Sequence, residues 1–164
     1  GLVLTGLILI LVISAEYYTV DPSDRRYRAA RLSLNAWAYL IALVAFVLIY
    51  SAKARSLVSA TGVAVVSTLL ALEFLRSAGQ GFGRTALYAL IVGLITGELI
   101  WAMNYWRIAG LTGGLILLLG FYVATGLANQ QLQGRLTRRV LVEYAIVALV
   151  GLVVLLRFQA IQSI

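Results

Sequence analysis

Apolar residues occur in six runs along this chain of 164 residues, and charged or turn residues bound each run. A helix needs roughly 20 mostly apolar residues to cross a hydrocarbon core of about 30 Å, and slightly shorter runs can span with less tilt. The longest connection, residues 18–33, leaves no room for a soluble domain. The pattern therefore predicts an all-α fold, a transmembrane helical bundle of about six membrane-spanning helices with short loops, forming a single domain over residues 1–164. The expected spans are residues 2–17, 34–50, 57–75, 85–105, 108–128 and 140–156.

Composition agrees with lipid as the solvent for this chain. The sequence is 62% hydrophobic and 12% charged, with a mean hydropathy of +0.98. The surface of a water-soluble globule of this size is far more polar. Because the sequence begins at Gly1, inside an apolar run and without a methionine, we expect the first span to be incomplete.

Basic residues outnumber acidic ones by 13 to 6, which gives a net charge of +7. They are scattered among short loops, so we expect topology signals and no nucleic-acid binding. The odd-numbered loops hold nine of them and the even-numbered side holds four. The positive-inside rule therefore predicts a multi-pass protein of the bacterial cytoplasmic (inner) membrane with its odd-numbered loops in the cytoplasm. The first loop carries Arg25, Arg26, Arg28 and Arg31, and the fifth carries Arg135, Arg138 and Arg139.

Two loops contain patterns typical of a helix start. Residues 21–24 place an acid at the capping position, a proline at the first helical position and a second acid two residues later. A helix should begin at Pro22 and run unbroken into the second span. The arginines of this loop would then lie along the membrane surface, as orientation signals or as a site for anionic lipid headgroups. Thr137 is predicted to cap the last helix in the same way.

One acidic residue lies well inside an apolar run. Water cannot solvate an ionised carboxylate there, so we expect Glu98 to be protonated, hydrogen-bonded or paired. At 100° per residue Glu98 shares one stripe of its helix with Trp101 and Tyr105. Three interpretations stay open: a polar contact within the bundle, a proton or cation pathway, or a contact with a lipid, a quinone or a partner subunit. The candidate site comprises Glu98, Trp101, Asn104, Tyr105 and Tyr122.

The apolar runs offer Glu98 few partners. No Lys or Arg lies within them, so a neutral carboxyl that donates to a hydroxyl or carbonyl oxygen requires the least free energy. The polar side chains available in these runs are Asn104, Tyr105, Tyr122, Thr96, Thr112, Ser67 and Thr68.

Small residues form a second stripe on the helix of Glu98. Ala89, Gly93 and Gly97 recur at fourfold spacing, which lets the backbone of another helix approach closely in a membrane. We therefore expect this helix to be central in the bundle. Similar small residues elsewhere are Ala60, Ala64 and Thr68 in the third run and Gly110 and Gly114 in the fifth.

The sequence contains no His and no Cys. Iron–sulfur clusters need thiolates, and most haem and zinc sites need imidazole. We therefore expect no metal and no cofactor that is bound covalently or through such side chains. Met103 is predicted to be a packing residue. Serine proteases require a histidine, and both aspartates lie in the first loop rather than in the membrane, so the protein is not expected to be an enzyme.

The C-terminal half of the chain carries a resemblance to a protein family. The stretch GELIWAMNYW at residues 97–106, GFY at 120–122, LTRR at 136–139 and EY at 143–144 together resemble a bacterial family of uncharacterised polytopic integral-membrane proteins. The resemblance implies that Glu98, Trp101 and Glu143 are features of that family. It implies no activity and no catalytic residue.

The absence of catalytic motifs, the short loops and the small-residue stripes favour a non-catalytic accessory or scaffolding subunit of a larger bacterial membrane complex. Respiration or photosynthesis, and hence electron transport, is the expected setting, with other membrane subunits and lipids as partners. The alternative is a small proton-linked or small-solute transporter or channel that uses Glu98 as a protonatable group. Transporters typically show internal repeats and broken helices, whereas Pro22, the only proline, lies outside the spans.

Overall fold

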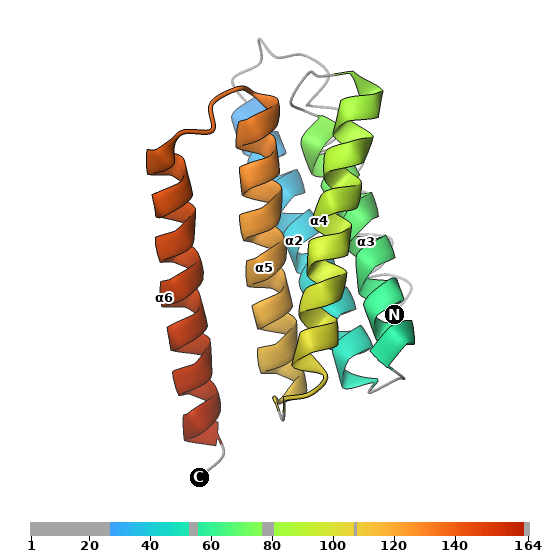
Figure 1. Cartoon of the computed structure of the whole chain (residues 1–164), viewed down its shortest axis with the longest axis vertical. Coiled ribbons are helices and arrows are strands. Elements are labelled where there is room, and N and C mark those ends of the chain that lie inside the picture. The colour runs from blue at the N-terminus through green and yellow to red at the C-terminus, as the bar shows by residue number, and fades with distance from the viewer. Residues whose placement is uncertain (1–26, 53–55, 77–80, 107, 163–164) are drawn as a thin grey trace. The chain divides into compact units, whose positions relative to one another are not determined.

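The protein, seen here as a computed structural model, consists of helices and short turns in the part that the structure describes, residues 27–52, 56–76, 81–106 and 108–162 (Figure 1). Within these ranges the chain forms five helices joined by short connections, as expected for an all-α protein. The helices are α2 (Tyr27–Ser51), α3 (Ser56–Arg76), α4 (Phe82–Met103), α5 (Gly110–Leu132) and α6 (Arg138–Gln162).

Four of these helices are long and apolar enough to cross a membrane, namely α3, α4, α5 and α6. The sequence predicted six spans, so the described residues support four. Helix α2 forms as one unbroken helix, in which Asn35–Ser51 is an apolar segment. The predicted span 2–17, the helix start at Pro22, and Arg25 and Arg26 lie outside the described residues.

The structure divides into two parts, residues 1–41 and 42–164, and each is described by itself. The first part contributes the beginning of α2, which carries Arg28 and Arg31. The second part contains the end of α2 and all of α3 to α6. Here α4 packs against α3 and α5, while α6 packs against α5 (Figure 1). The expectation that the fourth predicted helix has close neighbours on more than one side is confirmed.

Aromatic and aliphatic side chains fill the centre of the second part. Phe46 of α2 and Phe121 of α5 are fully buried, with ring centroids 5.8 Å apart in an edge-to-face arrangement. The ring centroid of Phe74 of α3 lies 6.1 Å from that of Phe121. Met103 is buried as predicted. The core therefore joins α2, α3 and α5 through one aromatic cluster.

Glycines set the close approach of α3 and α4. A Cβ atom added at Gly93 would lie 2.6 Å from the carbonyl oxygen of Ala64 and would overlap the side chain of Thr68. At Gly97 the added atom would lie 2.9 Å from the Cβ atom of Ala64 and 3.1 Å from the carbonyl oxygen of Ala60. The small stripe of α4 thus packs directly on the small stripe of α3, and the sequence prediction is confirmed.

Helix α5 uses glycines on two sides. Towards α2, Gly113 makes room for the ring of Tyr50, and Gly114 lies against Val47. Towards α6, Gly126 lies under the ring of Tyr144. In each case a neighbouring side chain occupies the space that a Cβ atom would need. Helix α5 therefore packs between α2 and α6, whose bulky side chains occupy the space beside its glycines.

The turn from α5 to α6 follows from local hydrogen bonds. Gly134 adopts a φ of 67°, and its N–H donates to the carbonyl oxygen of Gln131 at 3.0 Å. The N–H of Arg135 donates to the carbonyl oxygen of Gln130 at 2.9 Å, which completes a Schellman motif. Helix α6 then begins at Arg138, where the Thr137 hydroxyl accepts from the N–H of Val140 at 3.4 Å. The predicted cap at Thr137 is confirmed.

Candidate functional site

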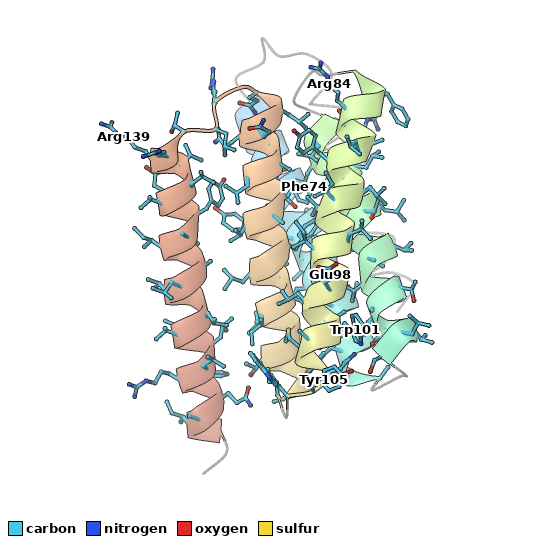
Figure 2. The ribbon with its side chains drawn as sticks, viewed as in Figure 1. Phe74, Arg84, Glu98, Trp101, Tyr105 and Arg139 are labelled. Atoms are coloured by element: carbon cyan, nitrogen blue, oxygen red, sulfur yellow. The ribbon has the colours of Figure 1, made fainter. Side chains whose placement is uncertain are left out.

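Glu98 lies on the outward face of α4 (Figure 2). The side of α4 that packs on α3 and α5 carries the small and β-branched residues, and it leaves the opposite side uncovered. Burial therefore separates the two stripes that the sequence predicted. The exposed stripe consists of Leu87, Ile91, Leu94, Glu98, Trp101, Ala102 and Tyr105.

Two aromatic residues share this face with Glu98. Trp101 is 54% exposed and Tyr105 is 76% exposed, and both lie towards the C-terminal end of α4, which ends at Met103 (Figure 2). Glu98 precedes that end by five residues, or about 7.5 Å along the helix axis. Indole and phenol rings near a helix end are typical of the membrane–water interface. Glu98 therefore lies nearer the middle of α4 than this aromatic pair.

Asn104 does not join the exposed face. Its side-chain amide donates to the hydroxyl oxygen of Ser59 at 3.0 Å, and that hydroxyl donates to the carbonyl oxygen of Ser56 at 3.1 Å. The Tyr50 hydroxyl also reaches this end of α4 and donates to the carbonyl oxygen of Met103 at 3.4 Å. These bonds attach the C-terminal end of α4 to α3 and to the end of α2.

Tyr122 lies on α5, with its ring 6.1 Å from that of Tyr144 on α6. The five residues of the predicted site therefore occupy three places. Glu98, Trp101 and Tyr105 are together on the outside of α4, Asn104 is part of the polar contact with α3, and Tyr122 lies beside α6.

Two of the expected partners of Glu98 donate to backbone carbonyl oxygens instead. The Thr68 hydroxyl donates to the carbonyl oxygen of Ala64 at 2.7 Å, and the Thr96 hydroxyl donates to that of Val92 at 2.8 Å. Within the described residues no hydrogen bond or ion pair to Glu98 is found. An ionised carboxylate facing hydrocarbon costs about 2.5 kcal/mol or more, so a carboxyl in such a position favours protonation or a polar partner.

Basic side chains gather at the opposite end of the bundle. Arg84 at the start of α4 and Arg139 at the start of α6 lie at the same end, away from Trp101 and Tyr105 (Figure 2). Arg76 lies in the last turn of α3 and pairs with Glu73 at 3.2 Å, where both side chains are about two-thirds exposed. An exposed pair of this kind contributes little to stability. The exposed arginines at this end are Arg76, Arg84, Arg135, Arg138 and Arg139.

Sequence reasoning missed Tyr50 and Ser59. Tyr50 stands at the end of a predicted span, where aromatic residues usually mark the interface, but the residue is only 7% exposed, because Gly113 leaves space for its ring. Ser59 opens a buried row at fourfold spacing on α3 that continues through Val63 and Ser67. This fourfold spacing in the sequence was the signal that could have identified Ser59 as buried. No group of three or more metal-ligating side chains occurs in the described part of the chain.

Long helices with apolar outward surfaces, joined by short turns and carrying most of their charges at their ends, define a multi-pass membrane protein. The family follows from comparison with known proteins. Residues 1–158 match the family DUF5656, described as a protein of unknown function, and the chain belongs to this family. The match extends well beyond the C-terminal half in which the sequence resemblance was noted. No curated protein and no solved structure matches the chain.

Proposed function

We propose that this protein is a non-catalytic accessory or scaffolding subunit that contacts other membrane subunits through the outward face of α4. The observation that carries the proposal is the exposed position of Glu98 on a face that is otherwise apolar and aromatic. Lipid tails cannot hydrogen-bond a carboxyl group, whereas a neighbouring protein chain can.

The same face has the composition of a protein contact. Trp101 and Tyr105 provide large, rigid surfaces with one polar atom each, and such residues are enriched in protein interfaces. Glu98 supplies a specific polar group between them and the aliphatic residues Ile91 and Leu94. A purely lipid-facing surface has no need of the carboxylate.

The charge distribution supports an orientation for the subunit. The described arginines of the third and fifth connections, Arg76, Arg84, Arg135, Arg138 and Arg139, are exposed near one end of the helices. Under the positive-inside rule that end faces the cytoplasm of a bacterial cell. We propose that the full chain has six spans. With the arginines on the cytoplasmic side, the face of Trp101 and Tyr105 lies towards the outer side of the cytoplasmic membrane.

A transporter or channel that uses Glu98 as its protonatable group stays a prediction. A path through the chain's own helices would place this carboxyl between helices, whereas its position on the outside of α4 favours contact with another molecule. The subunit proposal is therefore preferred.

The subunit proposal is tested by purifying the tagged chain from its native membranes in mild detergent. Native electrophoresis and mass spectrometry should find it in an assembly that contains foreign membrane subunits. Glu98→Leu should release it from that assembly. Glu73→Leu is the matched control, because Glu73 is also an exposed acid but already pairs with Arg76. Migration of the wild-type chain without foreign subunits would overturn the proposal.

A further inference from the structure

Helix α6 is the least covered helix of the second part of the chain. None of residues 138–161 is buried, whereas α3, α4 and α5 each bury several residues. Helix α6 lies at one edge of the bundle and packs against α5 (Figure 1). This contact places Tyr144 over Gly126 and Gly151 beside Leu119. Lipids can therefore reach most of the surface of α6.

Three arginines lie at the start of this open helix. Arg135 follows the turn after α5, and Arg138 and Arg139 are the first two residues of α6. All three are exposed, and Arg139 extends away from the neighbouring helices (Figure 2). Within the described part of the chain, none of them forms an ion pair or a side-chain hydrogen bond. Their guanidinium groups are therefore available to an anion from outside the chain.

Acidic residues do not neutralise this group of arginines. Glu143 lies one helical turn after Arg139, and it is exposed and makes no ion pair with the described residues. Three arginines and this one glutamate leave a net charge of +2 at the start of α6. Glu73 on α3 already pairs with Arg76. The start of α6 therefore presents an excess of positive charge.

Exposed apolar side chains lie directly beside these charges. Leu136 lies within the run of arginines, and Leu141 and Val142 follow it on the first turns of α6. The next basic residue along the chain is Arg157. A cationic group at the start of a long apolar helix, followed by exposed aliphatic side chains, offers separate surfaces to a charged headgroup and to acyl chains. The arrangement thus has the two chemistries of an anionic phospholipid in the order in which such a lipid presents them.

We infer that the headgroup of an anionic phospholipid binds to Arg135, Arg138 and Arg139, with its acyl chains along the exposed aliphatic residues of α6. Guanidinium groups form charge-assisted hydrogen bonds with phosphate oxygens, and the planar fork of arginine fits them well. A basic residue at an anionic membrane surface strengthens binding about fivefold. The inference does not involve the outward face of α4, so it can fail or stand independently of the proposed function.

Two other roles for these arginines make different predictions. As orientation signals they act while the chain inserts into the membrane, and they require no preference among the lipids around the finished protein. An acidic segment of a partner protein would satisfy the charges but would leave Leu141 and Val142 to be covered separately. A phospholipid meets the charges and the aliphatic residues with one molecule.

Fluorescence quenching by labelled lipids tests the inference, because the chain contains no cysteine of its own and can be labelled at one position. Val142→Cys carries a fluorophore in the full chain, which is placed in phosphatidylcholine vesicles. Small amounts of phosphatidylglycerol or phosphatidylcholine with a spin-labelled acyl chain are the quenchers. Leu87→Cys on α4 is the matched control, since Val142 and Leu87 are both 56% exposed and each lies three residues after an arginine. We expect the ratio of quenching by phosphatidylglycerol to quenching by phosphatidylcholine to be about fivefold higher at position 142.

Charge changes of opposite sign should move this ratio in opposite directions. Arg138→Gln together with Arg139→Gln, in the Val142→Cys chain, should lower the ratio to the value at position 87. Glu143→Gln should raise it, because the acid beside the arginines is removed. A folding defect would not raise the ratio in one variant and lower it in the other, and circular dichroism should find equal helix content in both.

A second pair of arginines at the same end of the bundle controls for overall charge. Arg76→Gln together with Arg84→Gln removes as much charge and should leave the ratio at position 142 unchanged. Equal quenching by the two lipids at position 142 of the otherwise unchanged chain would overturn the inference. So would a preference that survives Arg138→Gln with Arg139→Gln. Loss of the preference on adding inorganic phosphate, with ionic strength held constant by chloride, would assign the arginines to free phosphate and would also overturn it.

Discussion

The two faces of α4 differ in what this chain provides for them. The inward face is closed by the chain itself, with Gly93 and Gly97 in contact with the backbone of α3. The outward face carries a carboxylate and two large aromatic residues, yet the described helices leave it exposed. Small residues are satisfied by close packing against a neighbouring helix. An acid among apolar residues needs a polar group as its partner. The comparison supports the proposal that the outward face of α4 contacts a partner.

The largest effect is expected on the inward face. Gly93→Ala adds a Cβ atom 2.6 Å from the carbonyl oxygen of Ala64, and backbone atoms cannot move aside as a side chain can. We expect a loss of about 2–3 kcal/mol of unfolding free energy, measured by denaturation in mixed detergent micelles. Gly83→Ala is the control, since nothing lies within 4 Å of its added atom. Equal stability of the two variants would contradict the close packing of α3 and α4.

A smaller loss is expected where α5 meets α6. In Gly126→Ala the three atoms nearest to the added atom belong to the ring and hydroxyl of Tyr144, a side chain that can rotate. We expect about 1–2 kcal/mol of destabilisation and faster amide hydrogen exchange in α6 than in α3. A loss larger than that of Gly93→Ala would show that α6 holds the bundle together more than α3 does.

The hydrogen bond at the end of α4 should contribute less again. Asn104→Ala and Ser59→Ala each remove one partner of the 3.0 Å bond. In a double-mutant cycle we expect a coupling energy of about 0.6 kcal/mol, the usual size of such bonds in membrane proteins. Additive effects of the two changes would mean that Asn104 does not anchor α4 to α3.

The smallest effect on the stability of a single chain is expected from Glu98→Gln. Because Glu98 makes no hydrogen bond within the described residues, its replacement should leave detergent unfolding unchanged while it weakens association in native membranes. Native electrophoresis beside the unfolding measurement separates the two effects. A clear loss of single-chain stability would make Glu98 a structural residue of the bundle and would remove the difference between the two faces.

Much of the inward face could be predicted from the sequence. Fourfold spacing of Ala89, Gly93 and Gly97 is a property of one helix, and so is the complementary spacing on α3. The cap at Thr137 is also local, since its partner lies three residues away. Features that depend only on residues close in sequence, or on the spacing within one helix, can be predicted from the sequence.

The outward face could be recognised only in part. Periodicity placed Glu98, Trp101 and Tyr105 on one stripe but could not say which side of α4 meets other helices, because that depends on the packing of α3 and α5. The buried ring of Tyr50 was hidden for the same reason. Helix α6 continues past the last predicted span to Gln162, because backbone hydrogen bonds do not end where an apolar run ends.

A photo-reactive amino acid placed on the two outward surfaces gives the most direct test of the central claim. Leu94 on α4 and Leu69 on α3 are 54% and 65% exposed, respectively, and each can carry the probe in native membranes. The account predicts protein adducts from position 94 and lipid adducts alone from position 69. Lipid adducts alone from both positions would show that the α4 face meets only the bilayer and would contradict the account.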